Sequence, residues 1–269
     1  MSEGCNGNCG SGGSCGLPAP TRQGVGRIIA VGSGKGGVGK STVTGLLAVA
    51  LRRAGYTVGI LDADVTGPSI PKLFGVTESP YMDESNKIQM PETKTGIKVL
   101  SANLLLEDGG MPVIWRGPLI TGAVKQFWEE GAWSGLDFAI IDLPPGTADA
   151  PLTVMQSIAV DGMFAVTTPQ ALSAMIVQKQ MYLSKMCLIP ILGLIENMSY
   201  AVCPCCGKPW DLFGSSHREE IEARFGLKTM ARIPIDERLA VLCDNGQIEE
   251  YENAELMDSL VLASLKKKK

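Results

Sequence analysis

The sequence is poor in histidine, in long apolar runs and in excess positive charge, and each shortage argues against a class of protein. Its single histidine, His217, lies in GSSHREE, which is typical of a helix start, so histidine-based catalysis is not expected. No apolar run approaches the roughly 18 residues that a membrane-spanning helix needs. The formal net charge is −4, whereas a general nucleic-acid binder usually carries a basic excess. We therefore expect neither nucleic acid nor a membrane as a partner.

A secretory leader is also missing from the pattern. The N-terminus, MSEGCNGNCGSGGSCG, is polar and glycine-rich rather than basic and then apolar. We therefore expect a cytoplasmic protein. In that compartment the eight cysteines favour thiols or metal ligands over disulfides.

Composition divides the chain into three parts. Residues 1–24 are rich in Gly, Ser and Asn and are predicted to form a flexible arm. The cysteines of this arm are Cys5, Cys9 and Cys15. Residues 25–265 are predicted to form one domain, since a chain of 269 residues suits one large α/β domain better than two small ones. Residues 266–269 are all lysine and are interpreted as a solvated tail.

Short apolar runs alternate with helical segments through the domain. The runs predicted as strands are IIAVGS, TVGILDAD, IKVLSAN, PVIW, DFAIIDLPPG, GMFAVTTP, ILGLIENMS and MARIPI. The segments predicted as helices are 41–54, 119–130, 171–186, 237–242 and 254–265. This alternation predicts an α/β fold, a mostly parallel sheet with helices on both faces. In such a sheet, ligands bind beyond the carboxyl ends of the strands.

The stretch SGKGGVGKST, between the first strand and the first helix, contains a phosphate-binding loop. The run from Gly34 to Ser41 satisfies G-x-x-x-x-G-K-S/T. Glycines let backbone N–H groups wrap the phosphates, Lys40 reaches the outer phosphates, and the Ser41 hydroxyl binds Mg²⁺. The loop residues expected to bind nucleotide are Gly34, Lys35, Gly36, Gly37, Val38, Gly39, Lys40, Ser41 and Thr42.

Aspartates end two other predicted strands. Asp142 ends FAIID, where a carboxylate can hold the magnesium shell directly or through water. Asp62 and Asp64 end LDAD, and one of them can polarise the attacking water while the other supports magnesium or the loop. With one histidine in the chain, catalysis is expected to rest on carboxylates, lysine and metal.

A second chemical feature is CPCCGKPW, in which Cys203 and Cys206 form a C-x-x-C pair on a tight loop. Such a knuckle suits a tetrahedral thiolate metal site, but one pair supplies only two ligands. A closed four-thiolate site needs a second pair from elsewhere in the chain or from another subunit. Cys205 leaves the choice of ligands open, and a redox dithiol is an alternative. Cys187 and Cys243 lie in apolar helical surroundings and are predicted core residues.

The phosphate loop, GKGGVGKST, resembles the deviant loop of the MinD, ParA and nitrogenase-iron-protein group of P-loop ATPases. This resemblance implies a nucleotide-sandwich homodimer in which Lys35 reaches across to the partner's phosphates, like an arginine finger. Lys40 would then serve its own nucleotide. A cation supplied only on dimerisation couples hydrolysis to assembly.

Further motifs are similar to those of the Mrp/ApbC family of iron–sulfur carrier ATPases, over about residues 25–250. They are DADVTGPSIPKLFG, IWRGPLITGA, DLPPGTAD, and ENMSYAVCPCCG followed by DLFG. The resemblance implies slow ATP hydrolysis and a homodimer whose paired C-x-x-C cysteines hold a bridging 4Fe–4S cluster, which passes to apo-proteins. In this chain the implied cluster ligands are Cys203 and Cys206.

The same resemblance assigns roles to polar residues by position. Asp64 matches the switch carboxylate, Asp142 the magnesium-linked one, and Asn197 the adenine contact. The prediction that the nucleotide base is adenine rather than guanine also rests on the absence of an N-K-x-D motif at ENMS. The N-terminal arm differs from that of the eukaryotic family members that carry a four-cysteine motif, because the arm of this chain has only three cysteines. A stable cluster within one such arm would lack a ligand, so a transient metal relay or a disordered arm is expected instead.

Two alternatives stay open on the sequence. A positioning ATPase of the MinD/ParA type would bind a membrane or a DNA-bound partner. Membrane targeting would favour an amphipathic basic helix, whereas MDSLVLASLKKKK is only modestly amphipathic and that class does not require CPCCG. A structural zinc site would use the same thiolate ligands and tetrahedral geometry as an iron–sulfur site.

Overall fold

The computed structural model describes residues 19–64, 69–105, 117–146, 149–170, 173–214 and 216–266. The predicted strand PVIW and the three cysteines of the predicted arm lie outside these residues. So do the first half of the WRGP motif and residues 65–68, which follow the LDAD aspartates.

A seven-stranded sheet forms the middle of the molecule, in the order β11-β8-β7-β1-β6-β2-β5. Every neighbouring pair runs parallel. The strands are β1 (Arg27–Ser33), β2 (Val58–Asp62), β5 (Lys98–Ser101), β6 (Phe138–Asp142), β7 (Gly162–Thr167), β8 (Ile191–Glu196) and β11 (Thr229–Arg232). Continuous apolar runs suit strands that are covered on both faces. The predicted α/β fold with a mostly parallel sheet is therefore confirmed.

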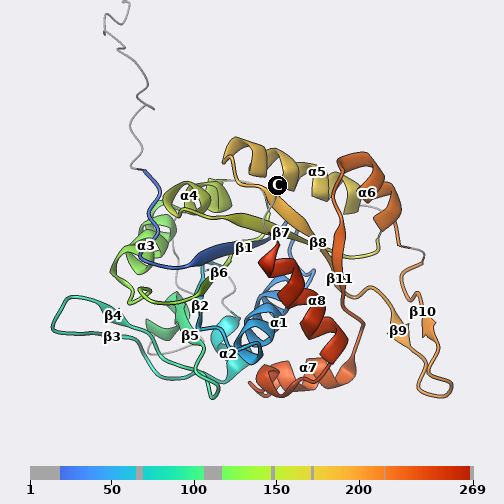
Figure 1. The fold of residues 1–269 in the computed structure, drawn as a ribbon, viewed down its shortest axis with the longest axis horizontal. Helices are drawn as coiled ribbons and strands as arrows, with labels where there is room; N and C mark the ends of the chain where they lie inside the picture. The colour runs from blue at the N-terminus through green and yellow to red at the C-terminus, as the bar shows by residue number, and fades with distance from the viewer. Residues whose placement is uncertain are drawn as a thin grey trace, which may run out of the picture.

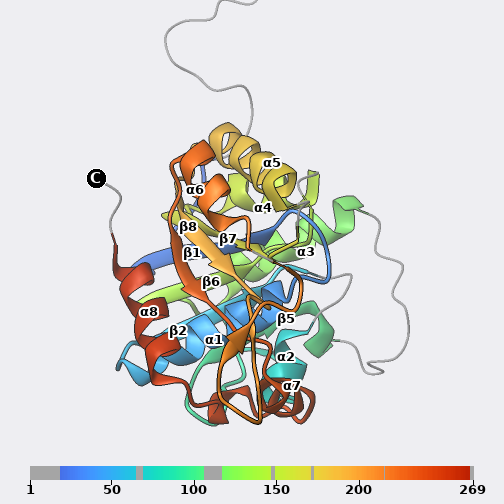
Figure 2. The same ribbon diagram turned by 90° about the vertical axis from the view of Figure 1, so that its right-hand side faces the viewer.

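Helices cover both faces of this sheet, giving three layers (Figures 1 and 2). One face carries α1 (Lys40–Arg53), α2 (Ile70–Phe74), α7 (Glu237–Asp244) and α8 (Ala254–Leu265). The other face carries α3 (Gly117–Glu130), α4 (Asp149–Ser157), α5 (Ser173–Met186) and α6 (Arg218–Phe225). The layers bury one apolar cluster on each side of the sheet.

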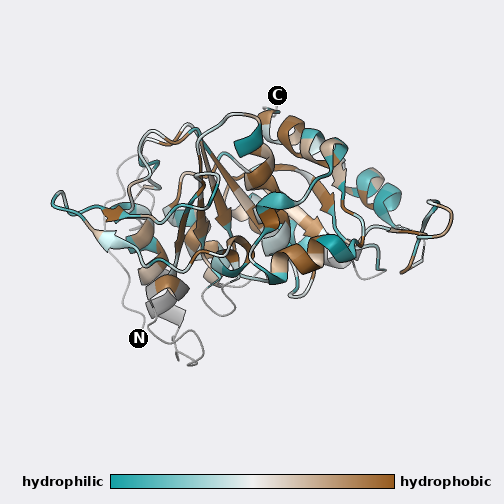
Figure 3. Ribbon diagram, turned by 90° about the horizontal axis from the view of Figure 1, so that it is seen from below, coloured by the Kyte–Doolittle hydropathy of each residue, from teal (hydrophilic) through white to brown (hydrophobic). Residues whose placement is uncertain are grey.

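Successive residues of a central strand pack alternately into the two apolar clusters. In β1, Ile29 packs into the cluster beneath α1, and its neighbour Ile28 packs into the other. The central strands are accordingly brown in Figure 3, the colour of hydrophobic residues. Cys243 is buried in the first cluster, as predicted, and Cys187 is partly buried and packs against the second.

Several short elements were not predicted. They are α2, α4, the 3₁₀ helices η1 (Ala102–Leu105) and η2 (Ile248–Glu250), and two hairpins, β3 (Tyr81–Met82) with β4 (Ile88–Gln89) and β9 (Ala201–Val202) with β10 (Pro209–Trp210). Two-residue strands and one-turn helices hold too few residues to show apolar periodicity. In α4, Pro151 stands in the first turn, where proline is tolerated, but the pattern resembles a break. The two hairpins project from opposite ends of the molecule in Figure 1.

The last residues of the predicted arm, 19–24, contact the domain. Thr21 forms an isolated parallel bridge with Ile158. Arg22 forms a 2.6 Å ion pair with Asp161. These contacts hold the segment beside the connection between α4 and β7. Among the described residues, no helix combines the length and apolar character needed to cross a bilayer.

Candidate functional site

The carboxyl ends of the central strands bring the predicted aspartates together. Asp62, the last residue of β2, lies in register with Asp142, the last residue of β6. On the other side of β6 runs β1, which ends at Ser33 beside the phosphate-binding loop. Residues from three separate segments of the chain therefore meet at one edge of the sheet, where ligands of such folds bind.

The loop between β1 and α1 depends on glycine. Gly37 and Gly39 have φ angles of 79° and 75°, left-handed values that residues with side chains rarely adopt. A Cβ at Gly39 would also lie 2.2 Å from Asn197 Nδ2. That nitrogen donates to the Val38 carbonyl at 2.8 Å. Asn197, predicted to contact adenine, thus supports the loop backbone itself.

Asp142 is the centre of a buried polar cluster at the start of α1. Its Oδ2 accepts from Lys40 Nζ at 2.8 Å and from the Ser41 hydroxyl at 2.6 Å. Its Oδ1 accepts from the Thr44 hydroxyl at 2.7 Å. Such partners are needed because an unpaired buried charge is costly. Lysine, hydroxyl and carboxylate, the groups that handle phosphate and magnesium in P-loop proteins, thus lie within hydrogen-bonding distance of one another.

Thr44 is a site residue that sequence reasoning missed. It follows Lys40 by four residues on α1, so both side chains lie on the same face of the helix. This spacing, beside an aspartate expected at the same edge of the sheet, was the available signal. A threonine in a helix is too common to be singled out without knowledge of what it contacts.

Asp62 and Asp64 have different surroundings. Asp62 is 1% exposed, and its carboxylate accepts from the Asp64 N–H and the Ser101 hydroxyl, each at 3.1 Å. Burial, followed by the negative charge of Asp142, raises the pKa of Asp62 to about 8, although Lys40 opposes the rise. Asp64 Oδ2 lies 3.7 Å from Lys40 Nζ. Asp62 is therefore tied into the strand end, whereas Asp64 faces the lysine of the loop.

The two loop lysines are held by different parts of the fold. Lys40 is 6% exposed and pairs with the end of β6. Lys35 is partly exposed, and its Nζ donates to Gln170 Oε1 at 3.0 Å, in the segment after β7. The Lys35 carbonyl accepts from the Ser33 hydroxyl at 2.9 Å. The contact with Gln170 joins segments far apart in the chain and was not predicted.

The C-x-x-C pair lies on the β9–β10 hairpin. The Cys203 N–H donates to the Lys208 carbonyl at 3.0 Å, and the Gly207 N–H donates back to the Cys203 carbonyl at 2.9 Å, which closes the turn. Cys203 is partly exposed, and Cys205 and Cys206 are exposed. Hydrogen bonds from the backbone N–H groups of Cys206 and Cys205 lower the pKa of Cys203. The turn therefore presents thiols to solvent and favours the thiolate form of one of them.

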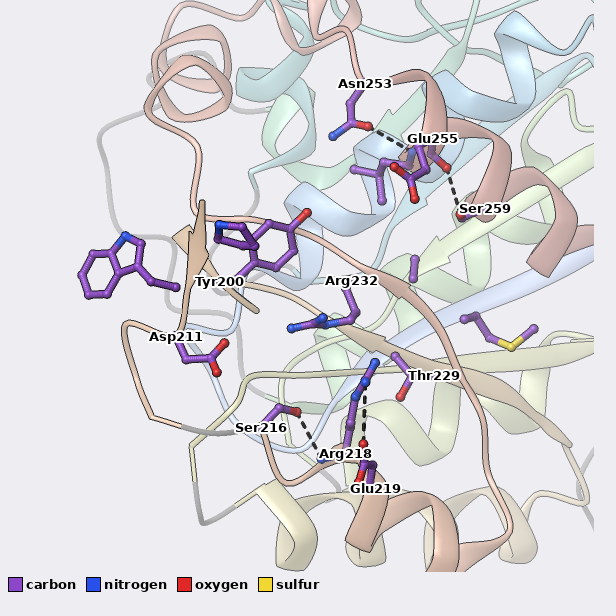
Figure 4. A pocket seen from close by; sticks show the side chains of 15 residues that line it. Tyr200, Asp211, Ser216, Arg218, Glu219, Thr229, Arg232, Asn253, Glu255 and Ser259 are labelled. Atoms are coloured by element: carbon purple, nitrogen blue, oxygen red, sulfur yellow. Dashed lines mark hydrogen bonds and ion pairs between the residues drawn. The ribbon is translucent and has the colours of Figure 1, made fainter. Parts of the chain in front are cut away.

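Apolar side chains around this hairpin are exposed. Val202 and Trp210, on its two strands, are each 49% exposed, and Leu212 and Phe213 follow them. A hollow of about 790 Å³ lies between the hairpin, the edge strand β11 and the first turns of α6 and α8. Figure 4 shows the Arg232 side chain in this hollow.

In the metal-free protein, alkylation at neutral pH is expected to modify Cys203 well before Cys243. Burial, with the nearby charge of Asp244, raises the pKa of Cys243 to about 11, whereas backbone hydrogen bonds lower the pKa of Cys203. The thiolate is the reactive form. Timed iodoacetamide labelling with peptide mass spectrometry measures the order, and both cysteines should react at similar rates in urea. Faster labelling of Cys243 in the folded protein would contradict this expectation.

Relatives of known kind match nearly the whole chain. The sequence pattern of the family described as ParA: NUBPL iron-transfer P-loop NTPase matches residues 24–266. A Clostridium perfringens protein named iron-sulfur cluster carrier protein is 42% identical over 265 residues, which is 94% of this chain and 93% of that protein. A Methanocaldococcus jannaschii protein of the same name is 47% identical over 232 residues, 85% of this chain and 80% of that protein.

Solved structures agree with these relatives. A nucleotide-binding protein from Archaeoglobus fulgidus, in complex with ADP, superposes with a TM-score of 0.77 at 44% identity, over 85% of this chain and 90% of that one. The Pyrococcus furiosus cell division ATPase MinD has a TM-score of 0.64 at 21% identity, over 88% and 98% of the two chains, and shares the fold. The predicted resemblances to Mrp/ApbC carriers and to the MinD/ParA fold are confirmed. The chain belongs to the NUBPL iron-transfer P-loop NTPase family.

Proposed function

We propose that this protein is an ATP-dependent carrier of iron–sulfur clusters, which holds a cluster at a homodimer interface and transfers it to apo-proteins. One observation carries the proposal: a single chain combines a phosphate-binding loop, with its buried Lys40–Asp142 pair, and an exposed C-x-x-C hairpin. The relatives named iron-sulfur cluster carrier protein point to the same cargo.

The phosphate loop supports ATP binding. Gly37 and Gly39 shape a loop whose backbone N–H groups can surround phosphates, at the N-terminus of a 14-residue helix whose dipole favours negative charge. Ser41 and Asp142, whose side chains already share a hydrogen bond, would hold Mg²⁺, which neutralises phosphate charge when bound. Asn197, in contact with the loop backbone, is proposed to contact the adenine.

Asp62, which ends β2, and Asp64, which follows the strand, support slow hydrolysis. Asp64, 3.7 Å from Lys40 Nζ, is the carboxylate proposed to orient the attacking water. Asp62 accepts a hydrogen bond from the Asp64 N–H and so positions that residue. Phosphoryl transfer depends on positioning and charge stabilisation, which these groups can supply without a histidine.

Lys35 is proposed to act on the nucleotide of the partner subunit. Its side chain is partly exposed and is held by Gln170, whereas Lys40 already serves its own Asp142. A cation added across a homodimer interface acts as an arginine finger does, and it ties hydrolysis to dimerisation.

The cysteine hairpin is proposed to hold the cluster between two subunits. One C-x-x-C pair, Cys203 and Cys206, supplies two thiolates, so two subunits supply the four that a 4Fe–4S cluster needs. The exposed Val202 and Trp210 beside the pair fit a surface that meets another protein, either the second subunit or a recipient. Exposed thiolates at a turn also leave a route for transfer.

Anaerobic reconstitution with iron and sulfide tests this function. After desalting, we expect a broad absorption band near ~400 nm and about four irons and four sulfides per dimer. A count of about eight irons per dimer would assign a second cluster to the N-terminal cysteines. A colourless protein that retains zinc in air would refute cluster binding and favour a structural metal site. Pelleting with anionic vesicles in ATP, without bound iron, would favour a positioning ATPase.

A further inference from the structure

A single buried carboxylate holds both ends of the segment that carries the cysteine hairpin. Glu196, the last residue of β8, is 2% exposed. The Ser199 hydroxyl donates to Glu196 Oε2, and the Ser216 hydroxyl donates to Glu196 Oε1. Between these two serines the chain runs through β9, the C-x-x-C turn and β10. Ser199 and Ser216, the two anchors of the hairpin segment, therefore both bind the Glu196 side chain.

Arg232, in the edge strand β11, completes this cluster. Its Nε donates to the Ser199 hydroxyl oxygen at 2.8 Å and lies 3.5 Å from Glu196 Oε2. Its guanidinium carbon lies 5.1 Å from the centre of the Tyr200 ring. In Figure 4, Arg232, Tyr200 and Ser216 border the hollow beside the hairpin. Glu196 thus has hydroxyl and guanidinium partners, as a buried charge requires.

The same strand end also reaches the phosphate-binding loop. Asn197, the next residue after Glu196, donates its side-chain N–H to the Val38 carbonyl at 2.8 Å. Its backbone N–H donates to the Thr167 carbonyl at 2.8 Å, at the end of the neighbouring strand β7. Contacts therefore run without interruption from the loop, through two adjacent residues, to both anchors of the hairpin segment.

We infer that Glu196 is a positioning residue that couples the phosphate-binding loop to the cysteine hairpin; this coupling would link nucleotide state to cluster binding in the function proposed above. A displacement of Asn197 on nucleotide binding passes to Glu196 through one peptide bond. It then reaches Ser199 and Ser216 together, because both hydroxyls bind the same carboxylate. In Glu196→Gln, charge-assisted hydrogen bonds become weaker neutral ones, and only one acceptor oxygen is left for two hydroxyl donors.

Hydrogen exchange of residues 199–216 tests the coupling, with Glu249→Gln as the matched control. Glu249 is also buried, at 8% exposed, and accepts hydroxyl hydrogen bonds from Thr93 and Thr95. The full chain is measured free and with Mg²⁺ and a non-hydrolysable ATP analogue. We expect the analogue to change the exchange rates of the hairpin amides about tenfold in the wild type and the control. In Glu196→Gln we expect these rates to change less than about twofold. The analogue's Kd should stay within about threefold in all three.

Each outcome decides the inference. A nucleotide-dependent change that persists in Glu196→Gln, or is absent from the wild type, overturns it. If Glu196→Gln does not fold, Ser216→Ala removes one anchor, keeps the carboxylate and should also lose the response; a retained response overturns the inference. Exchange is read without a cluster. A hairpin that responds to nucleotide in a protein that binds no iron would therefore refute the proposed function and leave the coupling intact.

Discussion

Replacing both Cys203 and Cys206 with serine is expected to lower bound iron from about four atoms per reconstituted dimer to fewer than about one. The hairpin is exposed, and its turn is closed by backbone hydrogen bonds, so the change removes thiolates without disturbing the core. Serine hydroxyls are poor ligands for an iron–sulfur cluster, which is held by thiolates. Iron and acid-labile sulfide assays after desalting measure the loss, and circular dichroism checks that the fold is retained.

Two single variants make this result specific. Cys187→Ser removes a partly buried thiol that packs against the core, and we expect it to keep about four irons per dimer. Cys205→Ser tests whether the third thiol of the turn is a ligand, and a full iron content assigns the cluster to the other two. If the double variant kept its full iron content, the cluster site would lie elsewhere in the chain.

Lys35→Ala is expected to lower the rate of ATP hydrolysis by about 10³-fold while ADP still binds to the isolated subunit. The reason lies in the different surroundings of the two loop lysines. Lys35 is partly exposed and contacts Gln170, so its loss leaves the buried Lys40–Asp142 pair intact. Phosphate release measures hydrolysis, and a fluorescent ADP measures binding. A loss of ADP affinity as large as the loss in hydrolysis rate would mean that Lys35 binds the nucleotide of its own subunit.

Mixing two inactive variants separates action across the interface from action within a subunit. Lys40→Ala removes the buried lysine and leaves Asp142 without its cation, so we expect it to lose hydrolysis and some stability. In a mixed dimer with Lys35→Ala, one site combines an intact Lys40 with the partner's intact Lys35. Random pairing then restores about a quarter of wild-type hydrolysis, because half of the dimers are mixed and each has one complete site. No recovery despite subunit exchange would argue against action across the interface.

Most of the fold could be predicted from local patterns in the sequence. Buried parallel strands such as β6 are short, continuous apolar runs, and the glycine-rich loop stands between a strand and a helix, as its chemistry requires. The short elements were not predicted, because a strand of two residues such as β9 shows no apolar periodicity. The residue types in LDAD left the roles of Asp62 and Asp64 open, and only the family resemblance singled out Asp64. The structure shows that their surroundings differ, since Asp62 accepts a hydrogen bond from Ser101 and Asp64 lies near Lys40.

The sequence by itself determined the phosphate-binding loop, the C-x-x-C pair, the α/β class and the family, because these depend on residue types at fixed spacings along one stretch of chain. Only the tertiary structure decided which distant groups meet. Thr44 joins Asp142 because α1 packs beside the end of β6, and Glu196 binds both Ser199 and Ser216 because the chain returns to β8 after the hairpin. Such contacts depend on strand order, register and burial, which no local pattern encodes.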